Sequence, residues 1–243
     1  MNKTEIKLQY DVCEEKNQGL PVIIVAAGSS TRMQGKNKQF LNLNGIPVIV
    51  KTLLCFENCD AIKNIILVTK ADDVFKLQQL AEEYSINKLT DIVCGGETRQ
   101  ESVLNGFERI AEEDEYVLIH DGARPLVTNE IICSVAKALE NCFAVTCAVK
   151  VKDTIKEVDA EGKVIKTLVR DSLVAVQTPQ GVRKKEYLGA VEKIGDVTGF
   201  TDDMSIMEAA GFDVFTVEGN YKNIKITTPE DVKTATAFAE DEF

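Results

Sequence analysis

Short apolar runs alternate with amphipathic stretches along most of the chain, and this alternation restricts its fold more than any other feature. Residues 22–25 and 65–69 are typical of buried strands, whereas residues 47–56 and 72–84 show the spacing of helices. Further strands are expected at 91–94, 116–119, 143–149 and 214–217, and further helices at 103–110, 128–141, 201–210 and, after a Thr228 cap, from Pro229 onward. Thr201 is the expected N-cap of the helix at 201–210. Strands that alternate with helices predict an α/β fold with a doubly wound, mostly parallel sheet and helices on both faces.

One region departs from this alternation and predicts a hairpin. Residues 154–158 and 164–169 alternate apolar and polar side chains around Asp159-Ala160-Glu161-Gly162. We interpret residues 150–176, approximately, as an arm that projects from the main sheet and pairs with a second subunit; a plain surface hairpin is the alternative. Residues 1–20 are polar and rich in turn formers, so we expect an N-terminal extension followed by a single domain at 21–243.

Composition excludes several classes of partner. The net charge of −11 argues against broad nucleic-acid affinity, because nonspecific binding needs a basic face, although Lys and Arg gathered in one cleft could still bind a small anion. No segment reaches the roughly 18 uninterrupted apolar residues of a membrane span, and the first residues lack the apolar core of a signal peptide. The seven cysteines form no C-x-x-C pair and are expected to be reduced thiols. We therefore expect a cytoplasmic protein that binds neither membranes nor nucleic acids.

Small and charged residues follow the expected strands directly, at the positions where α/β sheets bind their ligands. Ala26-Ala27-Gly28 leaves a turn almost bare of side chains, so a phosphate chain could approach the backbone N–H groups. Arg32 and Lys38 follow on the same loop and could neutralise phosphate charge. Two later strands end in Gly95-Gly96-Glu97 and in His120-Asp121-Gly122-Ala123-Arg124-Pro125.

The first loop matches neither of the common nucleotide-binding fingerprints. Lys38 lies too far from the strand for a Walker A motif, and only Gly28 precedes Gly35 where a dinucleotide fingerprint needs three glycines. An NAD-dependent dehydrogenase is therefore disfavoured. Taken alone, Arg32 and Lys38 would be interpreted as solvated loop charges. Their agreement with the other strand ends favours a loop that grips a triphosphate.

Seven segments, in register, resemble the 2-C-methyl-D-erythritol 4-phosphate cytidylyltransferases of the non-mevalonate isoprenoid pathway. In chain order they are AAGSSTRM with NKQF, GGETRQESV, HDGARP, VKDT, QTPQ, TDD and NIKITTPED. The resemblance implies a Rossmann-like nucleotidyltransferase that transfers CMP from CTP to methylerythritol phosphate and releases pyrophosphate. Ribitol-5-phosphate cytidylyltransferases share most of these motifs and are the alternative. In them we expect a larger residue at 122 or 123 and no TDD at 201–203, so the sequence favours the erythritol enzyme. A non-catalytic, regulatory nucleotide-binding protein of the same fold is a third possibility.

The resemblance also implies roles for individual residues. The catalytic cations on the phosphates would be Arg32, Lys38 and Lys225. The nucleotide would be bound by Ala26, Ala27, Gly28, Gly95, Gly96, Arg99, Ser102, Asp121 and Gly122, with Arg99 bracing its loop. The acceptor would be bound by Thr154, Arg170, Thr178, Thr201 and Asp202, of which the first two would come from the partner's arm in a homodimer. Mg²⁺ or another divalent cation would be held mainly by the CTP phosphates, with Asp121 as its candidate protein ligand. His120, the only histidine, is assigned no acid–base role.

Overall fold

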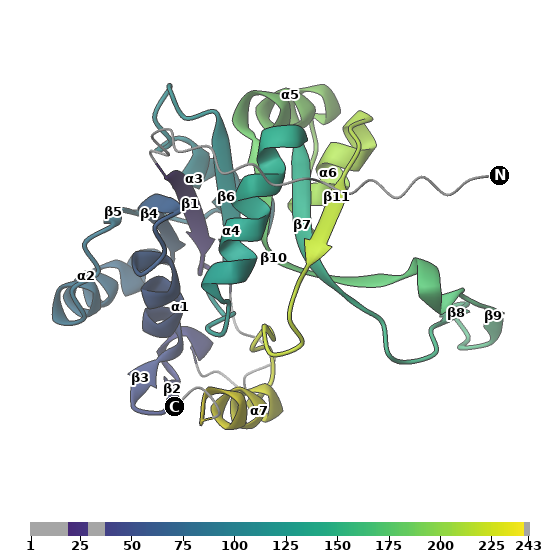
Figure 1. Cartoon of the computed structure of the whole chain (residues 1–243), viewed down its shortest axis with the longest axis horizontal. Coiled ribbons are helices and arrows are strands. Elements are labelled where there is room, and N and C mark those ends of the chain that lie inside the picture. The colour runs from purple at the N-terminus through teal and green to yellow at the C-terminus, as the bar shows by residue number, and fades with distance from the viewer. Residues whose placement is uncertain (1–18, 29–36, 241–243) are drawn as a thin grey trace.

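A seven-stranded sheet forms the centre of the computed structural model, which describes residues 19–28 and 37–240 (Figure 1). In spatial order its strands are β11 (Phe215–Glu218), β7 (Ala144–Lys150), β10 (Val174–Arg183), β6 (Tyr116–Asp121), β1 (Leu20–Val25), β4 (Ile62–Thr69) and β5 (Leu89–Cys94). β10 runs antiparallel to both of its neighbours, whereas the other pairs are parallel. The prediction of a mostly parallel sheet is therefore confirmed.

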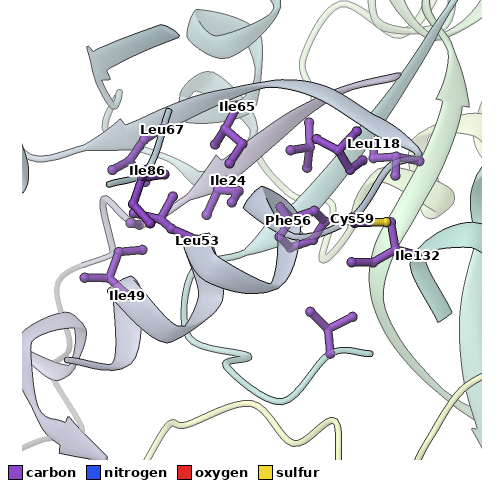
Figure 2. Close-up of a cluster of buried hydrophobic side chains, with 14 of the residues drawn as sticks. Ile24, Ile49, Leu53, Phe56, Cys59, Ile65, Leu67, Ile86, Leu118 and Ile132 are labelled. Atoms are coloured by element: carbon purple, nitrogen blue, oxygen red, sulfur yellow. The ribbon is translucent and has the colours of Figure 1, made fainter. Parts of the chain in front are cut away.

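Helices cover both faces of this sheet, as predicted for a doubly wound fold. One face is covered by α1 (Val48–Glu57), α2 (Val74–Glu83) and α4 (Asn129–Ala138), and the other by α3 (Arg99–Phe107), α5 (Lys184–Ile194) and α6 (Asp203–Ala210). β1 shows why its sequence is apolar without interruption. Val22 and Ile24 pack into the first apolar cluster, drawn in Figure 2, whereas Ile23 packs into the second. Successive side chains of a strand point to opposite faces, so a strand buried on both sides needs an apolar residue at every position.

Short elements complete the fold around this sheet. A small antiparallel pair, β2 (Asn42–Leu43) and β3 (Ile46–Pro47), contacts the C-terminal helix α7 (Pro229–Glu240). Within residues 19–28 and 37–240, four 3₁₀ helices lie at Lys38–Phe40, Ala71–Asp73, Leu139–Asn141 and Arg170–Ser172. Among the described residues, no helix is both long enough and apolar enough to cross a membrane.

Strand β10 and helix α5 have no counterpart among the elements expected from the sequence. β10 contains Pro179, which has no backbone N–H to donate to a neighbouring strand. The pairing of β10 with β7 is irregular there, with a register shift between Val176 and Gln180. The interrupted pattern of this segment therefore reflects a strand that pairs in two parts.

The predicted hairpin is present and stands away from the central sheet (Figure 1). β8 (Lys156–Val158) and β9 (Val164–Thr167) pair only with each other, and all of their residues are exposed. The hairpin leaves the sheet after β7 and returns at Val174, which pairs with Lys150. Its apolar side chains lie in solvent, with Ile165 58% exposed.

The caps of the last two helices settle one prediction each. The prediction that Thr201 caps α6 is wrong: Asp202 is the N-cap, and its Oδ1 accepts the Ser205 N–H at 3.1 Å. α7 begins at Pro229 as predicted, and Asp231 Oδ2 accepts the backbone N–H groups of residues 227 and 228, each at 2.8 Å. Partial burial alone would raise the pKa of Asp231, but these hydrogen bonds and that from the Thr227 hydroxyl lower it below its usual value.

Candidate active site

A pocket of about 320 Å³ opens at the C-terminal ends of β1, β5 and β6. Val25 pairs with Asp121, so the segments that follow β1 and β6 leave the sheet at the same edge. Eight residues predicted from the sequence line this pocket, namely Ala27, Gly28, Lys38, Gly96, Arg99, Ser102, Asp121 and Lys225. The sheet therefore brings together segments that lie far apart in the chain.

Small residues pack tightly against one another on the floor of this pocket and directly beneath it. A Cβ added to Gly95 would lie 2.4 Å from the Ala27 Cβ and 2.7 Å from Ser102 Oγ. The Gly96 N–H donates to Ser102 Oγ at 3.1 Å, which fixes the turn before α3. Any larger residue at these positions would displace its neighbours or fill the pocket.

The loop after β1 is joined to the segment that carries Lys225. Lys38 Nζ donates to the Ile226 carbonyl at 3.1 Å, and Gln39 Nε2 donates to the Ala26 carbonyl at 3.4 Å. Lys38 thus lines the pocket together with Lys225, the residue before its bonding partner. Arg32 lies outside the described residues, so its role on the phosphates stays a prediction.

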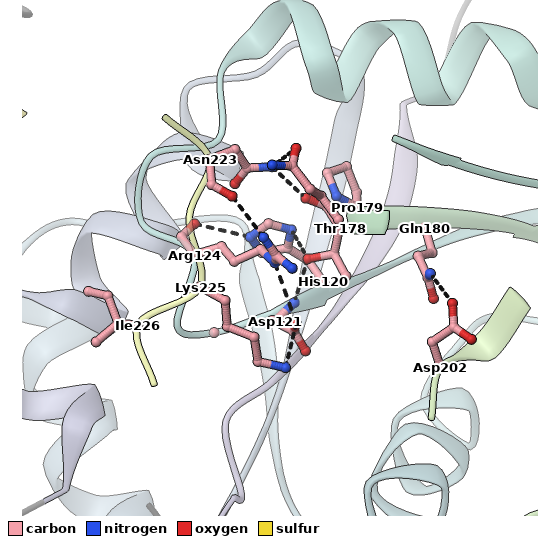
Figure 3. Close-up of polar contacts among 12 residues, drawn as sticks. His120, Asp121, Arg124, Thr178, Pro179, Gln180, Asp202, Asn223, Lys225 and Ile226 are labelled. Carbon is pink, nitrogen blue, oxygen red and sulfur yellow. Dashed lines mark hydrogen bonds and ion pairs between the residues drawn. The ribbon is translucent and has the colours of Figure 1, made fainter. Parts of the chain in front are cut away.

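The carboxylate of Asp121 is the electrostatic centre of the site (Figure 3). Its Oδ2 lies 2.8 Å from Lys225 Nζ and 3.5 Å from Arg124 Nε, and its Oδ1 lies 3.7 Å from Arg99 Nε. Burial alone would raise the pKa of Asp121, but Lys225, Arg99 and Arg124 lower it well below its usual range. Asp121 is therefore ionised at neutral pH and holds three cations close together.

Arg99 connects this centre to helix α6. Its Nη2 donates to Asp203 Oδ2 at 2.8 Å, and the Tyr187 hydroxyl donates to Asp203 Oδ1 at 2.8 Å. Burial would lower the pKa of Arg99, but the carboxylates of Asp203 and Asp121 raise it, so the guanidinium stays charged. Arg99 Nη1 is buried and has no hydrogen-bond partner among the described residues.

A second pocket, of about 330 Å³, adjoins the first. Arg99, Asp121 and Lys225 line both pockets. Three predicted acceptor-binding residues also line the second, namely Thr178, Thr201 and Asp202. Gln180 holds this wall in place, because its Nε2 donates to Asp202 Oδ2 at 2.7 Å and its Oε1 accepts the Asp203 N–H at 3.2 Å. The two pockets therefore meet at Asp121 and at the cations Arg99 and Lys225, and two ligands could share this cationic centre.

His120 lies directly behind this centre and is fully buried. Its Nδ1 lies 3.0 Å from Thr178 Oγ1, and its Nε2 lies 3.2 Å from the Arg124 carbonyl oxygen. Burial, the largest influence, lowers the pKa of His120 to about 3; Asp121 opposes this shift, and Arg124 and Lys225 add to it. The imidazole is therefore neutral, as befits a histidine without an acid–base role.

Five predicted site residues do not line either pocket. Ala26 and Gly95 lie beneath the floor, and Gly122 donates its N–H to the Val25 carbonyl at 2.9 Å. Thr154 and Arg170 lie on the exposed arm, where Arg170 Nη1 donates to the Lys152 carbonyl at 3.1 Å.

Three residues that organise the site have no role predicted from the sequence, namely Arg124, Gln180 and Asn223. Arg124 Nη1 donates to the Asn223 carbonyl at 2.7 Å, and Asn223 Nδ2 donates to the Thr178 carbonyl at 2.9 Å. All three fall inside the segments HDGARP, QTPQ and NIKITTPED, so the motifs mark them. Their contacts depend on how β6, β10 and the segment before α7 come together.

An open α/β sheet with two adjoining pockets at its strand ends, which share a carboxylate and two cations, is typical of a protein that binds anionic ligands there. The family model described as 2-C-methyl-D-erythritol 4-phosphate cytidylyltransferase (IspD) matches residues 20–241. The chain belongs to this family, which confirms the resemblance seen in the motifs.

Individual relatives agree with this assignment. The 2-C-methyl-D-erythritol 4-phosphate cytidylyltransferase of Bacillus cereus is 45% identical over 219 residues, which cover 89% of this chain and 96% of that protein. The Clostridium novyi protein of the same name is 44% identical over 213 residues, covering 86% and 92%. The crystal structure of 4-diphosphocytidyl-2C-methyl-D-erythritol synthase from Anaerococcus prevotii matches with a TM-score of 0.82 and 33% identity, covering 92% of this chain and 97% of that one.

Proposed function

We propose that the chain transfers CMP from CTP to 2-C-methyl-D-erythritol 4-phosphate and releases pyrophosphate. The observation that carries this proposal is the cationic centre shared by the two pockets, in a chain that belongs to the cytidylyltransferase family. CTP would occupy the pocket lined by Gly96 and Ser102, and the acceptor would occupy the pocket lined by Thr178. The family match favours methylerythritol phosphate over ribitol phosphate as the acceptor.

The reaction then requires positioning and charge compensation more than proton transfer. An oxygen of the acceptor phosphate forms a bond to the α-phosphorus of CTP, and the bond from that phosphorus to the bridging oxygen of pyrophosphate breaks. The acceptor phosphate is already largely dianionic at neutral pH, so it needs no general base. Lys225 lies where the two pockets meet and would offset the charge that grows around the α-phosphorus. Lys38 and Arg32 would hold the leaving pyrophosphate.

Magnesium dependence is part of the proposal. The described residues contain no group of three His, Cys, Asp or Glu side chains placed to bind a metal ion. A single ionised carboxylate nevertheless suits Mg²⁺, which keeps several waters and binds through substrate phosphates. Asp121 is such a carboxylate and would hold the ion, which would supply positive charge to the phosphate oxygens.

We also propose that the enzyme works as a cytoplasmic homodimer. The apolar side chains of the hairpin are exposed, and burying them against a second copy would be favourable. Thr154 and Arg170 would then reach the acceptor of the partner subunit. Because the cysteines of the described residues form no disulfide, a reducing compartment suits the protein.

The proposal is tested by measuring pyrophosphate release with CTP held fixed and the acceptor varied. Methylerythritol phosphate should support turnover in the presence of Mg²⁺, and a chelator should abolish it. Turnover with ribitol 5-phosphate alone would assign the chain to the other activity. Tight CTP binding without turnover on any acceptor would indicate a regulatory nucleotide-binding protein.

A further inference from the structure

Lys225, which lines both pockets, lies on a segment without regular secondary structure. β11 ends at Glu218 and α7 begins at Pro229, and residues 219–228, all of which the structure describes, form neither a helix nor a strand. The backbone groups of such a segment need partners from other parts of the fold. Charge compensation in a reaction depends on cations that are already in place. The contacts of this segment therefore decide how well Lys225 can act.

Gln177, on β10, binds the turn at residues 219–223, which precedes Lys225. Its Nε2 donates to the Asn220 carbonyl at 2.9 Å, and its Oε1 accepts the Asn220 N–H at 3.3 Å. One side-chain amide thus pairs with both backbone groups of a single residue. Gln177 is only 7% exposed, which favours these partners over water.

Both ends of this turn lie close against β7 and β10. The Gly219 N–H donates to the Ala148 carbonyl at 2.8 Å. A Cβ added to Gly219 would lie 2.5 Å from Gln177 Oε1 and 3.2 Å from the backbone nitrogen and oxygen of Ala148. At the other end, Asn223 is fully buried and donates from Nδ2 to a β10 carbonyl at 2.9 Å (Figure 3). The glycine therefore allows an approach that a larger residue would prevent.

The segment is held separately on the other side of Lys225. The Ile226 N–H donates to the Ala123 carbonyl at 2.8 Å, and the Ile226 carbonyl accepts Lys38 Nζ at 3.1 Å. Lys225 thus lies between two anchored points. Loss of the contacts upstream of it would displace its side chain without releasing the whole segment.

We propose that Gln177 is a positioning residue, which holds the turn at residues 219–223 and thereby places Lys225 where the two pockets meet. The inference rests on the proposed function, in which Lys225 offsets the charge that grows around the α-phosphorus. Gln177 lines the second pocket, but its amide oxygen and nitrogen are both bonded to the turn. Its effect on the reaction is therefore exerted through Lys225.

Hydrogen exchange measured by mass spectrometry tests the anchoring of the turn without any turnover. Gln177→Met keeps the length of the side chain and removes both hydrogen bonds. Peptides covering residues 219–226 should exchange about tenfold faster in this variant, because the turn opens more easily. Gln79→Met is the matched control, since Gln79 is exposed on α2, and it should leave this exchange unchanged. Equal exchange of residues 219–226 in the two variants would overturn the proposal.

A double-mutant cycle with Lys225→Met tests whether Gln177 acts through Lys225. Alone, Gln177→Met should lower kcat about tenfold, which is less than the loss expected for Lys225→Met, because the anchor at Ile226 remains. Combined with Lys225→Met, it should change kcat less than about twofold, since the ammonium group that it displaces is already absent. Losses that multiply in the double variant would show an independent effect of Gln177 and would overturn the proposal.

Gly219→Ala disturbs the same contact from the side of the turn. It should lower kcat alone and add no further loss to Lys225→Met, whereas Gly189→Ala, with nothing within 4 Å of the added Cβ, should change neither. Equal rates in the two alanine variants would contradict the proposal. If Gln177→Met does not fold, Gly219→Ala decides the question by kinetics and by exchange. If the wild type releases no pyrophosphate with any acceptor, the proposed function fails, and hydrogen exchange still decides whether Gln177 anchors the segment.

Discussion

Replacing Asp203 by Asn tests whether the brace between α3 and α6 stabilises the fold. The Asp203 side chain is fully buried and accepts hydrogen bonds from Arg99 and Tyr187, each at 2.8 Å. Asn has nearly the same shape but a single acceptor oxygen, so one of the two donors would face an NH₂ group instead. The variant also leaves the charged guanidinium of Arg99 without its nearest counter-ion.

The expected loss of unfolding free energy follows from the burial of Arg99 and Asp203. Removing one partner of a buried ion pair costs about 3–5 kcal/mol. The lower end applies here, because the Arg99 side chain is 22% exposed and still has Asp121 at 3.7 Å. A loss of about 3 kcal/mol should lower the urea midpoint by about 1 M, given an m value of about 3 kcal/mol/M. The chain has no Trp, so unfolding is followed by far-ultraviolet circular dichroism.

Glu208→Gln is the matched control, because it removes one negative charge from the exposed side of the same helix. The urea midpoint of Tyr187→Phe should fall between those of Asp203→Asn and Glu208→Gln. This variant removes one hydrogen bond to a charged group, at a cost of about 1.5–3 kcal/mol, and leaves the ion pair intact. If Asp203→Asn and Glu208→Gln unfold at the same urea concentration, the brace does not stabilise the fold and the reasoning is refuted.

Three further perturbations test other parts of the structure. Gly95→Ala would place a Cβ 2.4 Å from that of Ala27, so kcat/KM for CTP should fall at least about tenfold, whereas Gly189→Ala, with nothing within 4 Å, should not change it. Asp231 stabilises the wild type above about pH 4, and this stabilisation is lost as the pH falls through its lowered pKa. Asp231→Asn should therefore lower the melting temperature above about pH 4 and flatten its dependence on pH below that value. Identical pH profiles of the melting temperature for the two proteins would contradict this. Replacing residues 156–167 by a short glycine linker should yield inactive monomers in sedimentation experiments, and an active dimer would exclude the arm's proposed role.

The strands and helices around β1 could be predicted because local periodicity and packing agree there. Val22, Ile23 and Ile24 are all apolar because both faces of β1 are covered. β10 escaped prediction because Pro179 interrupts its pattern, and its antiparallel place between β6 and β7 depends on the whole sheet. Asp202 in place of Thr201 as the cap of α6 could not be told from residue type, since both side chains are good N-caps.

For the site, the sequence identified most of the residues that line the pockets but not the bonds between them. Lys225 and Asp121 lie far apart in the chain, and only the fold brings them to 2.8 Å. The buried contacts of Asp203 and Gln180 belong to residues that look like ordinary polar side chains in the sequence. Such residues are recognised only when their partners from other elements are in view.

The central claim is that Lys225 serves both pockets, and steady-state kinetics of Lys225→Met tests it most directly. Lys233→Met is the control, because Lys233 is exposed on α7 and lines neither pocket. Pyrophosphate release is measured with CTP varied at fixed methylerythritol phosphate, and then with the two exchanged. We expect Lys225→Met to lower kcat by about a hundredfold or more and to raise KM for both substrates. Rates and KM values equal to those of Lys233→Met, or a change in KM for only one substrate, would contradict the shared site.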